Sequence, residues 1–364
     1  MKIAFYGSSL VSSYWNGAAT YYRGLLKALA GLGYDITFYE PDVYDRQQHR
    51  DIEPPDWCKV VVYDSTIEAL KQVALDAADA DIVVKTSGVG FEDDALLEAV
   101  FTAARPDAAR IFWDVDAPAT LAELRANPAH PLRLALPRID AVLTYGGGDP
   151  VVDAYRELGA RRCVPIYNAL DPETHYPVAS EPRFACDLAF LGNRLPDREE
   201  RVERFFLSPA ACLPDQRFLL GGAGWGDKPV PRNVGYIGHV GTRDHNAFNA
   251  TPKAVLNISR ASMAETGFSP ATRVFEAAGA GACIITDAWV GIELFLKPES
   301  EILVARDGKD VIDLMAGLSA ETARAIGRRA LVRVLAEHTY THRAKKADEV
   351  FRTLHAGQSV EAAE

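Results

Sequence analysis

Short apolar runs alternate with longer amphipathic or alanine-rich stretches along almost the whole chain. The first run, residues 2–6, ends at Gly7, and the apolar spacing over residues 18–32 that follows is typical of a helix ending at Gly33. A second apolar run, residues 35–39, completes the order strand, loop, helix, strand. This order predicts a parallel α/β sheet, because parallel strands need a crossover connection, usually a helix.

The same alternation continues in two series of predicted strands, which indicates two doubly wound α/β sheets. Between the two series lies a proline-rich and acidic segment, residues 168–184, whose weak periodicity predicts a linker. The later predicted strands of the first series are residues 60–63, 82–85, 110–113 and 141–144, and those of the second are 188–191, 217–220, 234–237, 254–257, 282–285 and 301–304.

The length of 364 residues suits two domains of ordinary size, each able to bury its own core. We predict one domain over residues 1–170 and a second over residues 171–340. The remaining segment, residues 341–364, is predicted to carry a final helix over residues 341–355.

Composition argues against a nucleic-acid partner, a cysteine-based metal site and a membrane span. The formal net charge of −11 at pH 7 opposes binding to nucleic acid, although a local basic pocket for one diphosphate remains compatible with it. The five cysteines show no metal-ligand spacing, so reduced thiols in a cytoplasmic protein are the simplest interpretation. No apolar run reaches the length of a membrane span.

The segment over residues 267–287 combines several signals of a ligand site. Ser269 followed by Pro270 predicts a helix start, preceded by a long loop over residues 261–268. The N–H groups and dipole of a helix N-terminus at the carboxyl edge of a parallel sheet favour a phosphate. Arg273 would add a positive charge there, and Glu276 lies on the same helix face as Arg273.

This segment resembles a known family. The run SPATRVFEAAGAG at residues 269–281, with flanking residues 257–260 and 289–293, resembles the nucleotide-sugar half of GT-B glycosyltransferases, and within these the family of the spore maturation protein CgeB. The resemblance extends to residues 7–42 and 171–177, so it covers nearly the whole chain.

The resemblance implies the GT-B fold, in which two Rossmann-like domains face each other across a cleft. Residues 1–170 would bind the acceptor and residues 171–340 the nucleotide-sugar donor, while residues 341–364 would pack back on the first domain. It further implies a GT4-like retaining glycosyltransferase that transfers sugar in the cleft, with no metal and no cofactor beyond the nucleotide-diphosphate sugar. One departure is that Phe268 stands where many retaining GT-B enzymes carry a second glutamate, and Glu265 lies three residues earlier.

Donor-binding candidates lie at the predicted strand ends of the second domain. We expect Glu276 to accept hydrogen bonds from two ribose hydroxyls, and Arg260 and Arg273 to contact diphosphate oxygens. For Arg273 the alternative is an exposed pair with Glu276, for the loop at Gly192 an ordinary tight turn, and for His239 a structural role. For Tyr236 and His239, it is the resemblance that implies a loop holding the nucleobase. The predicted donor-binding residues are Gly192, Asn193, Tyr236, His239, Arg260, Ser269, Pro270, Arg273 and Glu276.

Acceptor-side candidates lie in the loop over residues 8–20, which is long for a connection from strand to helix and is rich in aromatic and polar groups. We predict that it forms a wall of a ligand cleft. The predicted acceptor-side residues are Ser8, Ser9, Tyr14, Trp15, Asn16 and Gly17.

The catalytic candidates are Asp114 and Asp116, with Arg273 stabilising the departing diphosphate. The two carboxylates follow a buried strand, and their mutual repulsion would raise one pKa, which suits a general base. Asp116, further from the strand, is the preferred base, and an N-cap of a helix from Ala119 is the alternative role for either residue.

Two other functions use the same features. An epimerase of GT-B fold would use the same second domain without an external acceptor and would turn over with donor and water alone, whereas a non-catalytic binding or coat-associated protein would show no nucleotide affinity. The acceptor of the transferase, whether small molecule, glycan or protein, is left open by the sequence, as are the base and sugar of the donor.

Overall fold

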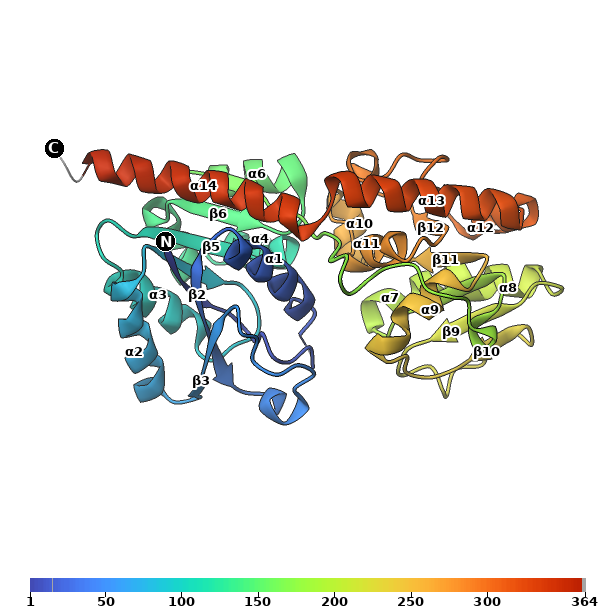
Figure 1. The fold of residues 1–364 in the computed structure, drawn as a ribbon, viewed down its shortest axis with the longest axis horizontal. Coiled ribbons are helices and arrows are strands. Elements are labelled where there is room, and N and C mark those ends of the chain that lie inside the picture. Colours follow the sequence, from blue (N-terminus) through green and yellow to red (C-terminus); the bar gives the residue numbers. More distant parts are fainter. Residues whose placement is uncertain (15, 362–364) are drawn as a thin grey trace. The chain divides into compact units, whose positions relative to one another are not determined.

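The protein is described by a computed structural model over residues 1–14 and 16–361. Its internal contacts divide the chain into two units (Figure 1). Unit 1 comprises Met1–Tyr167 and Tyr340–Glu364, and unit 2 comprises Asn168–Thr339. These divisions fall near residues 170 and 340, where the sequence pattern predicts its boundaries.

Unit 1 contains one parallel sheet of the doubly wound type. Its strand order is β3-β2-β1-β4-β5-β6-β7, so the direction of winding reverses between β1 and β4. Open sheets of this kind bind ligands beyond the carboxyl ends of the strands at such a reversal. The strands are β1 (Lys2–Tyr6), β2 (Asp35–Asp42), β3 (Lys59–Asp64), β4 (Ile82–Thr86), β5 (Ala109–Asp114), β6 (Ala141–Thr144) and β7 (Cys163–Pro165).

The two faces of this sheet are covered by different helices, because successive side chains of a strand point to opposite faces. Tyr6 of β1 belongs to the cluster formed with α2 and α3, whereas Phe5 contacts Tyr22 of α1 and Trp113 on the other side. The helices of unit 1 are α1 (Ala19–Gly31), α2 (Ile67–Leu75), α3 (Asp93–Ala103), α4 (Ala117–Ala126), α5 (Pro131–Ala135), α6 (Gly148–Glu157) and α14 (Tyr340–Glu361).

The last helix, α14, packs against α1 on the Phe5 face of the sheet (Figure 1). The contact is close at Gly24, where an added Cβ would lie 2.1 Å from Cδ2 of Tyr340. Phe351 of α14 contacts Trp113 edge-on, with ring centroids 6.4 Å apart. The fold of unit 1 is therefore completed by a helix that begins more than 170 residues after Tyr167.

Unit 2 repeats the architecture with the strand order β10-β9-β8-β11-β12-β13, again all parallel. Its winding reverses between β8 and β11. The strands are β8 (Leu188–Leu191), β9 (Phe218–Gly221), β10 (Val234–Tyr236), β11 (Ala254–Asn257), β12 (Ile284–Asp287) and β13 (Leu303–Ala305).

The helices of unit 2 cover both faces of this sheet. One buried cluster joins the strands to α8, α12 and α13 through residues such as Ala210, Met315 and Ile326, whereas α11 contacts β11 and β12 together with α9. The helices are α7 (Pro196–Val202), α8 (Ser208–Cys212), α9 (His245–Ala250), α10 (Ala261–Thr266), α11 (Thr272–Gly279), α12 (Gly308–Gly317) and α13 (Ala320–Glu337).

The predicted α/β class and the doubly wound order of both sheets are confirmed. Every apolar run assigned to a strand contributes residues to a strand, with shifted ends at several of them. β7 was not predicted, because this three-residue edge strand ends in Pro165 and gives too little pattern to recognise.

Two expectations about α11 and the segment before it are wrong. The segment over residues 261–268 is not a loop throughout, since Ala261–Thr266 forms α10, which ends at Gly267 with φ of 71°. The following helix begins at Thr272 rather than at Pro270, because Ala271 is still extended, with φ −63° and ψ 146°. The carbonyl of Pro270 accepts a hydrogen bond from the Asn168 side chain, which holds this extended segment in place.

Within the described residues, no helix combines the length and apolarity needed to cross a membrane. The cysteines, all of which are described, form no disulfide.

Gly24→Ala should destabilise the protein by about 1–3 kcal/mol, the usual cost of overpacking, because the new methyl group would overlap the Tyr340 ring. The measurement is urea unfolding followed by circular dichroism. Gly31→Ala is the matched control in the same helix, since nothing lies within 4 Å of a Cβ there. Equal stability of the two variants would contradict the close packing of α14 on α1.

Candidate functional site in unit 2

The candidate site of unit 2 lies at the carboxyl ends of its strands, where the loops after β8 and β11 flank the reversal of the sheet. The loop after β8 is fixed by backbone contacts to the loop after β9. Gly192 donates to the Gly221 carbonyl at 3.0 Å and accepts from the Trp225 indole at 2.8 Å, and Arg194 donates to the Ala223 carbonyl. A Cβ at Gly222, whose φ is +119°, would lie 2.2 Å from the Gly192 oxygen, so this approach requires glycine.

Three further donor-side candidates lie on the loop after β8 and at the end of β10. The Asn193 side chain accepts from the Ala223 amide at 2.9 Å, and the Tyr236 hydroxyl donates to the Gly222 carbonyl at 3.1 Å. Their polar groups therefore brace the loops in this structure. His239 is exposed beyond β10.

A buried carboxylate at the end of β12 organises the loop after β11. Asp287 is fully buried and accepts from both the amide and the hydroxyl of Ser259, at 3.0 and 3.1 Å. Its second oxygen is 2.6 Å from the guanidinium of Arg201, whose side chain is 25% exposed. Asp287 thus fixes the residue that precedes Arg260, and Arg260 stands at the start of α10.

The first turn of α11 carries the predicted cation. Ser269 is buried and Pro270 belongs to the extended segment before the helix, while Arg273 is the second residue of α11. Burial lowers the pKa of the Arg273 guanidinium, and the nearby Glu276 carboxylate acts in the opposite direction. A positive charge and a free helix N-terminus therefore occur together at this edge of the sheet.

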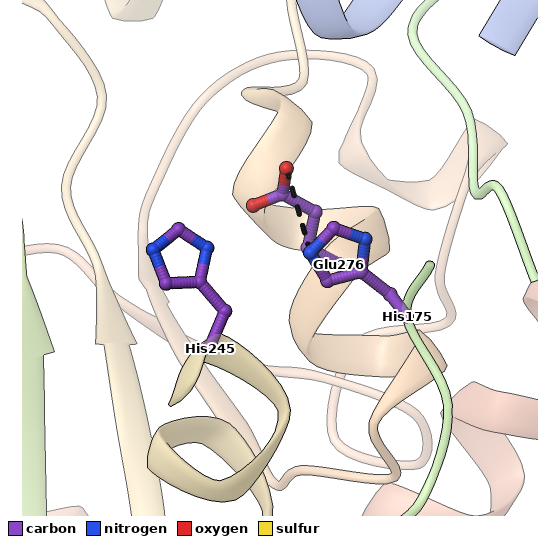
Figure 2. A group of neighbouring side chains, drawn as sticks. All are labelled: His175, His245 and Glu276. Atoms are coloured by element: carbon purple, nitrogen blue, oxygen red, sulfur yellow. Dashed lines mark ion pairs between the residues drawn. The ribbon is translucent and has the colours of Figure 1, made fainter. Parts of the chain in front are cut away.

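Glu276 faces two histidines that the sequence pattern did not single out (Figure 2). His175 lies within the predicted linker at residues 168–184, His245 begins α9, and one ligand atom of each residue lies within 4.8 Å of the others. The shortest measured separation is 3.9 Å, from His175 Nε2 to Glu276 Oε1. Both partners of that contact are largely enclosed, with side chains 7% and 14% exposed.

The electrostatics of this cluster favour a neutral imidazole at His245. Burial lowers the pKa of His245, the carboxylate of Glu276 raises it, and the charge of Arg273 lowers it further. His245 belongs to no motif that could be recognised in the sequence. His175 lies within the run at residues 171–177 that carries part of the family resemblance, and only that run could have drawn attention to it.

In unit 1 the two catalytic candidates differ in accessibility. Asp114 is fully buried at the end of β5 and accepts from the Ser87, Thr120 and Tyr155 hydroxyls and the Asp116 amide. Burial raises the pKa of Asp114, and these hydrogen bonds oppose the rise. Asp114 is therefore enclosed by its own donors in this structure.

Asp116 is partly exposed and is the N-cap residue of α4, without a side-chain capping bond. The helix begins at Ala117, two residues before the expected position, and its start is held by the contact between the Asp116 amide and Asp114. Asp116 is thus the more accessible of the two carboxylates.

The acceptor-side loop turns several of its polar groups inward. Ser8 donates to the Asn16 side chain at 3.0 Å, and the Asn16 amide group donates to the Ser9 carbonyl at 2.8 Å. Tyr14 is 40% exposed and stacks on His49 with ring centroids 4.0 Å apart. Gly17 is exposed, and the predicted residue Trp15 lies outside the described part of the chain.

Comparison with known families and structures agrees with this architecture. The model of a family described as glycosyl transferase-like matches residues 198–349. Comparison with curated proteins gives no significant match.

Solved structures similar to this chain share its fold over nearly their entire lengths. Sucrose-phosphate synthase from Thermosynechococcus elongatus has a TM-score of 0.70 at 14% identity, with 98% of this chain and 100% of that chain covered. HepE from Anabaena, in complex with UDP and glucose, has a TM-score of 0.67 at 13% identity, with 97% of this chain and 100% of that chain covered. AviGT4, a glycosyltransferase involved in avilamycin A biosynthesis, has a TM-score of 0.62 at 19% identity, with 98% of each chain covered. The fold is that of GT-B glycosyltransferases.

Asp287→Asn should destabilise unit 2 by about 2–4 kcal/mol, because the amide would leave the Arg201 charge unpaired and weaken the hold on Ser259. The measurement is the free energy of unfolding in urea. Asp313→Asn, which breaks an exposed i, i+4 pair with Lys309, should leave stability almost unchanged. If both variants were equally stable, the buried pair would not organise the loop.

Proposed function

We propose that this chain, which has the fold of GT-B glycosyltransferases, transfers a sugar from a nucleotide-diphosphate sugar to an acceptor, with the donor bound by unit 2. The observation that carries the proposal is the start of α11, where a helix N-terminus, Arg273 and Glu276 are gathered at the carboxyl edge of the sheet. The residues matched by the glycosyl transferase-like family model, 198–349, include this helix. That match favours transfer over epimerisation or binding without catalysis.

In this proposal Glu276 accepts hydrogen bonds from both hydroxyls of the donor ribose. A carboxylate offers two oxygens, so it satisfies a pair of adjacent hydroxyls without strain. His175 Nε2, at 3.9 Å, is too distant to use the carboxylate as a hydrogen-bond partner. The Glu276 side chain remains 14% exposed, which leaves an approach for a ligand.

The diphosphate lies in this proposal against the first turn of α11, where Arg273 and Arg260 meet its oxygens. Guanidinium groups match phosphate oxygens in bidentate fashion, and the helix dipole adds to the attraction. This set of positive groups stabilises the departing diphosphate without a divalent cation. HepE, whose structures contain UDP or UDP-glucose, is one protein of this fold that binds such a donor.

The general base in this proposal is Asp116 of unit 1. A base must reach the acceptor hydroxyl or amine, and Asp116 is partly exposed whereas Asp114 is enclosed. Asp114 then acts as a positioning residue, because its carboxylate holds the Asp116 amide at 2.9 Å. Asp114 also fixes Thr120 in the first turn of α4.

The subclass rests on the motif alone. The run from Ser269 to Gly281 supports a CgeB-like glycosyltransferase of the GT4-like, retaining type. Phe268, which occupies the place of a second glutamate, adopts a left-handed φ of 48° and packs where a Cβ on Gly291 would lie, 2.2 Å from its Cδ1. Any contact made by that second glutamate must therefore be supplied differently in this chain.

Glu276→Ala should weaken nucleoside diphosphate binding by roughly 2–4 kcal/mol, because two ribose hydroxyls lose a charged acceptor. A thermal-shift screen of UDP, GDP, TDP and CMP first identifies the base, and calorimetry then compares the variants. Glu265→Ala, an exposed glutamate of neighbouring α10, is the matched control and should bind normally. Unchanged affinity in a folded Glu276→Ala variant would rule out the ribose assignment.

Asp116→Asn should lower turnover by roughly 100-fold or more, the scale expected of a positioned base. Nucleotide affinity should stay the same, because the donor binds to unit 2. The measurement is steady-state transfer together with calorimetry, and Asp153→Asn on the exposed face of α6 is the control. Full turnover in Asp116→Asn would show that another group removes the proton.

A further inference from the structure

The cluster of His175, His245 and Glu276 presents three potential metal ligands from three separate segments of unit 2 (Figure 2). His175 lies within the predicted linker, His245 is the first residue of α9, and Glu276 lies in α11. One ligand atom from each residue lies within 4.8 Å of the other two, and His175 is buried with an exposed fraction of 6%.

The hydrogen bond on the far side of His175 determines its tautomer. The Thr174 hydroxyl donates its single proton to the Asp171 carbonyl at 3.1 Å, so its oxygen acts as the acceptor toward His175 Nδ1 at 3.0 Å. Nδ1 therefore carries the ring proton. The lone pair of the neutral ring then lies on Nε2, the nitrogen that faces Glu276.

In His245 it is Nε2 rather than Nδ1 that carries the ring proton, and again the unprotonated nitrogen faces Glu276. Its Nε2 lies 3.3 Å from the Val240 carbonyl, and a carbonyl only accepts hydrogen bonds, so Nε2 carries the proton. Figure 2 shows the other ring nitrogen, Nδ1, on the side toward Glu276. Both imidazoles thus direct an unprotonated nitrogen toward the same carboxylate.

This convergence leaves three electron-pair donors facing one another without a proton between them. The 3.9 Å between His175 Nε2 and Glu276 Oε1 exceeds the length of a hydrogen bond, so a shared proton does not join this pair. A cation bound among the three groups would remove their repulsion. Two imidazole nitrogens and one carboxylate are the donor set of many three-ligand zinc sites, which keep a fourth position for water.

The outer contacts of the cluster also match those of metal sites. Metal-binding histidines nearly always donate their second ring N–H to an oxygen, which orients the ring and selects the tautomer. Here the Thr174 hydroxyl and the Val240 carbonyl supply that oxygen for His175 and His245. Two independent elements of the chain have therefore pre-oriented these rings.

The geometry requires the three groups to move closer together. Ligand atoms about 2.0–2.2 Å from a tetrahedral zinc ion are about 3.3–3.6 Å apart, so the 3.9 Å separation must shorten by about 0.3–0.6 Å, and the widest pair, within 4.8 Å, by at most about 1.5 Å. The charge of Arg273, which acts on both His245 and Glu276, opposes a cation here and lowers the affinity. The site therefore suits a soft or borderline divalent ion that binds imidazole strongly, rather than Mg²⁺, which prefers oxygen ligands.

We propose that His175, His245 and Glu276 form a binding site for a divalent transition-metal ion such as Zn²⁺. The ion would occupy the carboxylate that the proposed function assigns to the donor ribose. Zinc and nucleotide would then compete, so zinc would inhibit donor binding rather than assist transfer. The competition rests on the proposed function, whereas the metal site itself does not.

The direct test measures zinc binding to the purified, metal-free full chain by competition with a chromophoric chelator. His175→Gln and His245→Gln should each lower zinc affinity at least 100-fold, because loss of a ligand costs more than the 10–100-fold typical of an outer contact. Thr174→Val, which removes only an outer contact, should cost about 10–100-fold. His355→Gln, on the exposed part of α14, is the control and should bind zinc normally, and Mg²⁺ should not displace the ion.

Equal zinc affinity in the wild type and both histidine variants would overturn the site. A second measurement applies even where a variant fails to fold. X-ray absorption at the zinc edge of the wild-type complex should show two imidazole ligands with oxygen ligands at about 2.0–2.2 Å. A spectrum with sulfur ligands, or with no imidazole, would equally overturn the proposal.

Nucleotide titration then separates the two proposals. Zinc at ten times its dissociation constant should raise the apparent dissociation constant of the bound nucleotide about tenfold in the wild type. The effect should vanish in His245→Gln. If the ion binds to the three ligands while nucleotide affinity stays unchanged, the metal site stands and the ribose role of Glu276 fails.

Discussion

The close approach of α11 to residues 170–175 of the predicted linker is the contact on which the unit 2 site depends. A Cβ at Gly279 would lie 2.4 Å from Cδ1 of Leu170 and 3.0 Å from the His175 carbonyl, so the helix reaches this distance only because residue 279 is glycine. Asn168 adds a hydrogen bond to the Pro270 carbonyl before the helix. These contacts set His175 against Glu276 and thereby create a polar cluster from residues 101 positions apart.

The two units use the same structural device with different chemistry. In each sheet, the second strand after the winding reversal ends in a fully buried aspartate. These residues are Asp114 at the end of β5 and Asp287 at the end of β12. Each carboxylate connects the loops beside it through its hydrogen bonds. Asp114 is satisfied by hydroxyls and an amide, whereas Asp287 also pairs with Arg201. Burial of an anion is tolerated at both positions because the donors are already in place.

Much of the fold was predictable, because continuous apolar runs and glycine-ended helices report burial directly. The runs at residues 141–144, 188–191 and 254–257 correspond to strands with the same ends. β7 was missed because three residues ending in proline produce no recognisable period, and α10 was missed because six residues before Gly267 are too few to show a helical period.

The site was predictable only where its residues share one short segment. Arg273 and Glu276 lie three positions apart on one helix, so their common face follows from helical spacing. His175 and His245 come from other segments, and only tertiary contacts bring them to Glu276. The same limit applies to Asp114, whose enclosure depends on Ser87 and Tyr155 from neighbouring elements.

The central claim is that Glu276 recognises the ribose hydroxyls of a nucleoside diphosphate, and a double comparison tests it most directly. The affinities of the wild type and Glu276→Ala are measured by calorimetry for the preferred nucleotide and for its 2′,3′-dideoxy analogue. The account predicts that removing the hydroxyls weakens binding at least about tenfold in the wild type and hardly at all in the variant, because the carboxylate and the hydroxyls are coupled. An equal loss in both proteins, or no loss in the wild type, would contradict it.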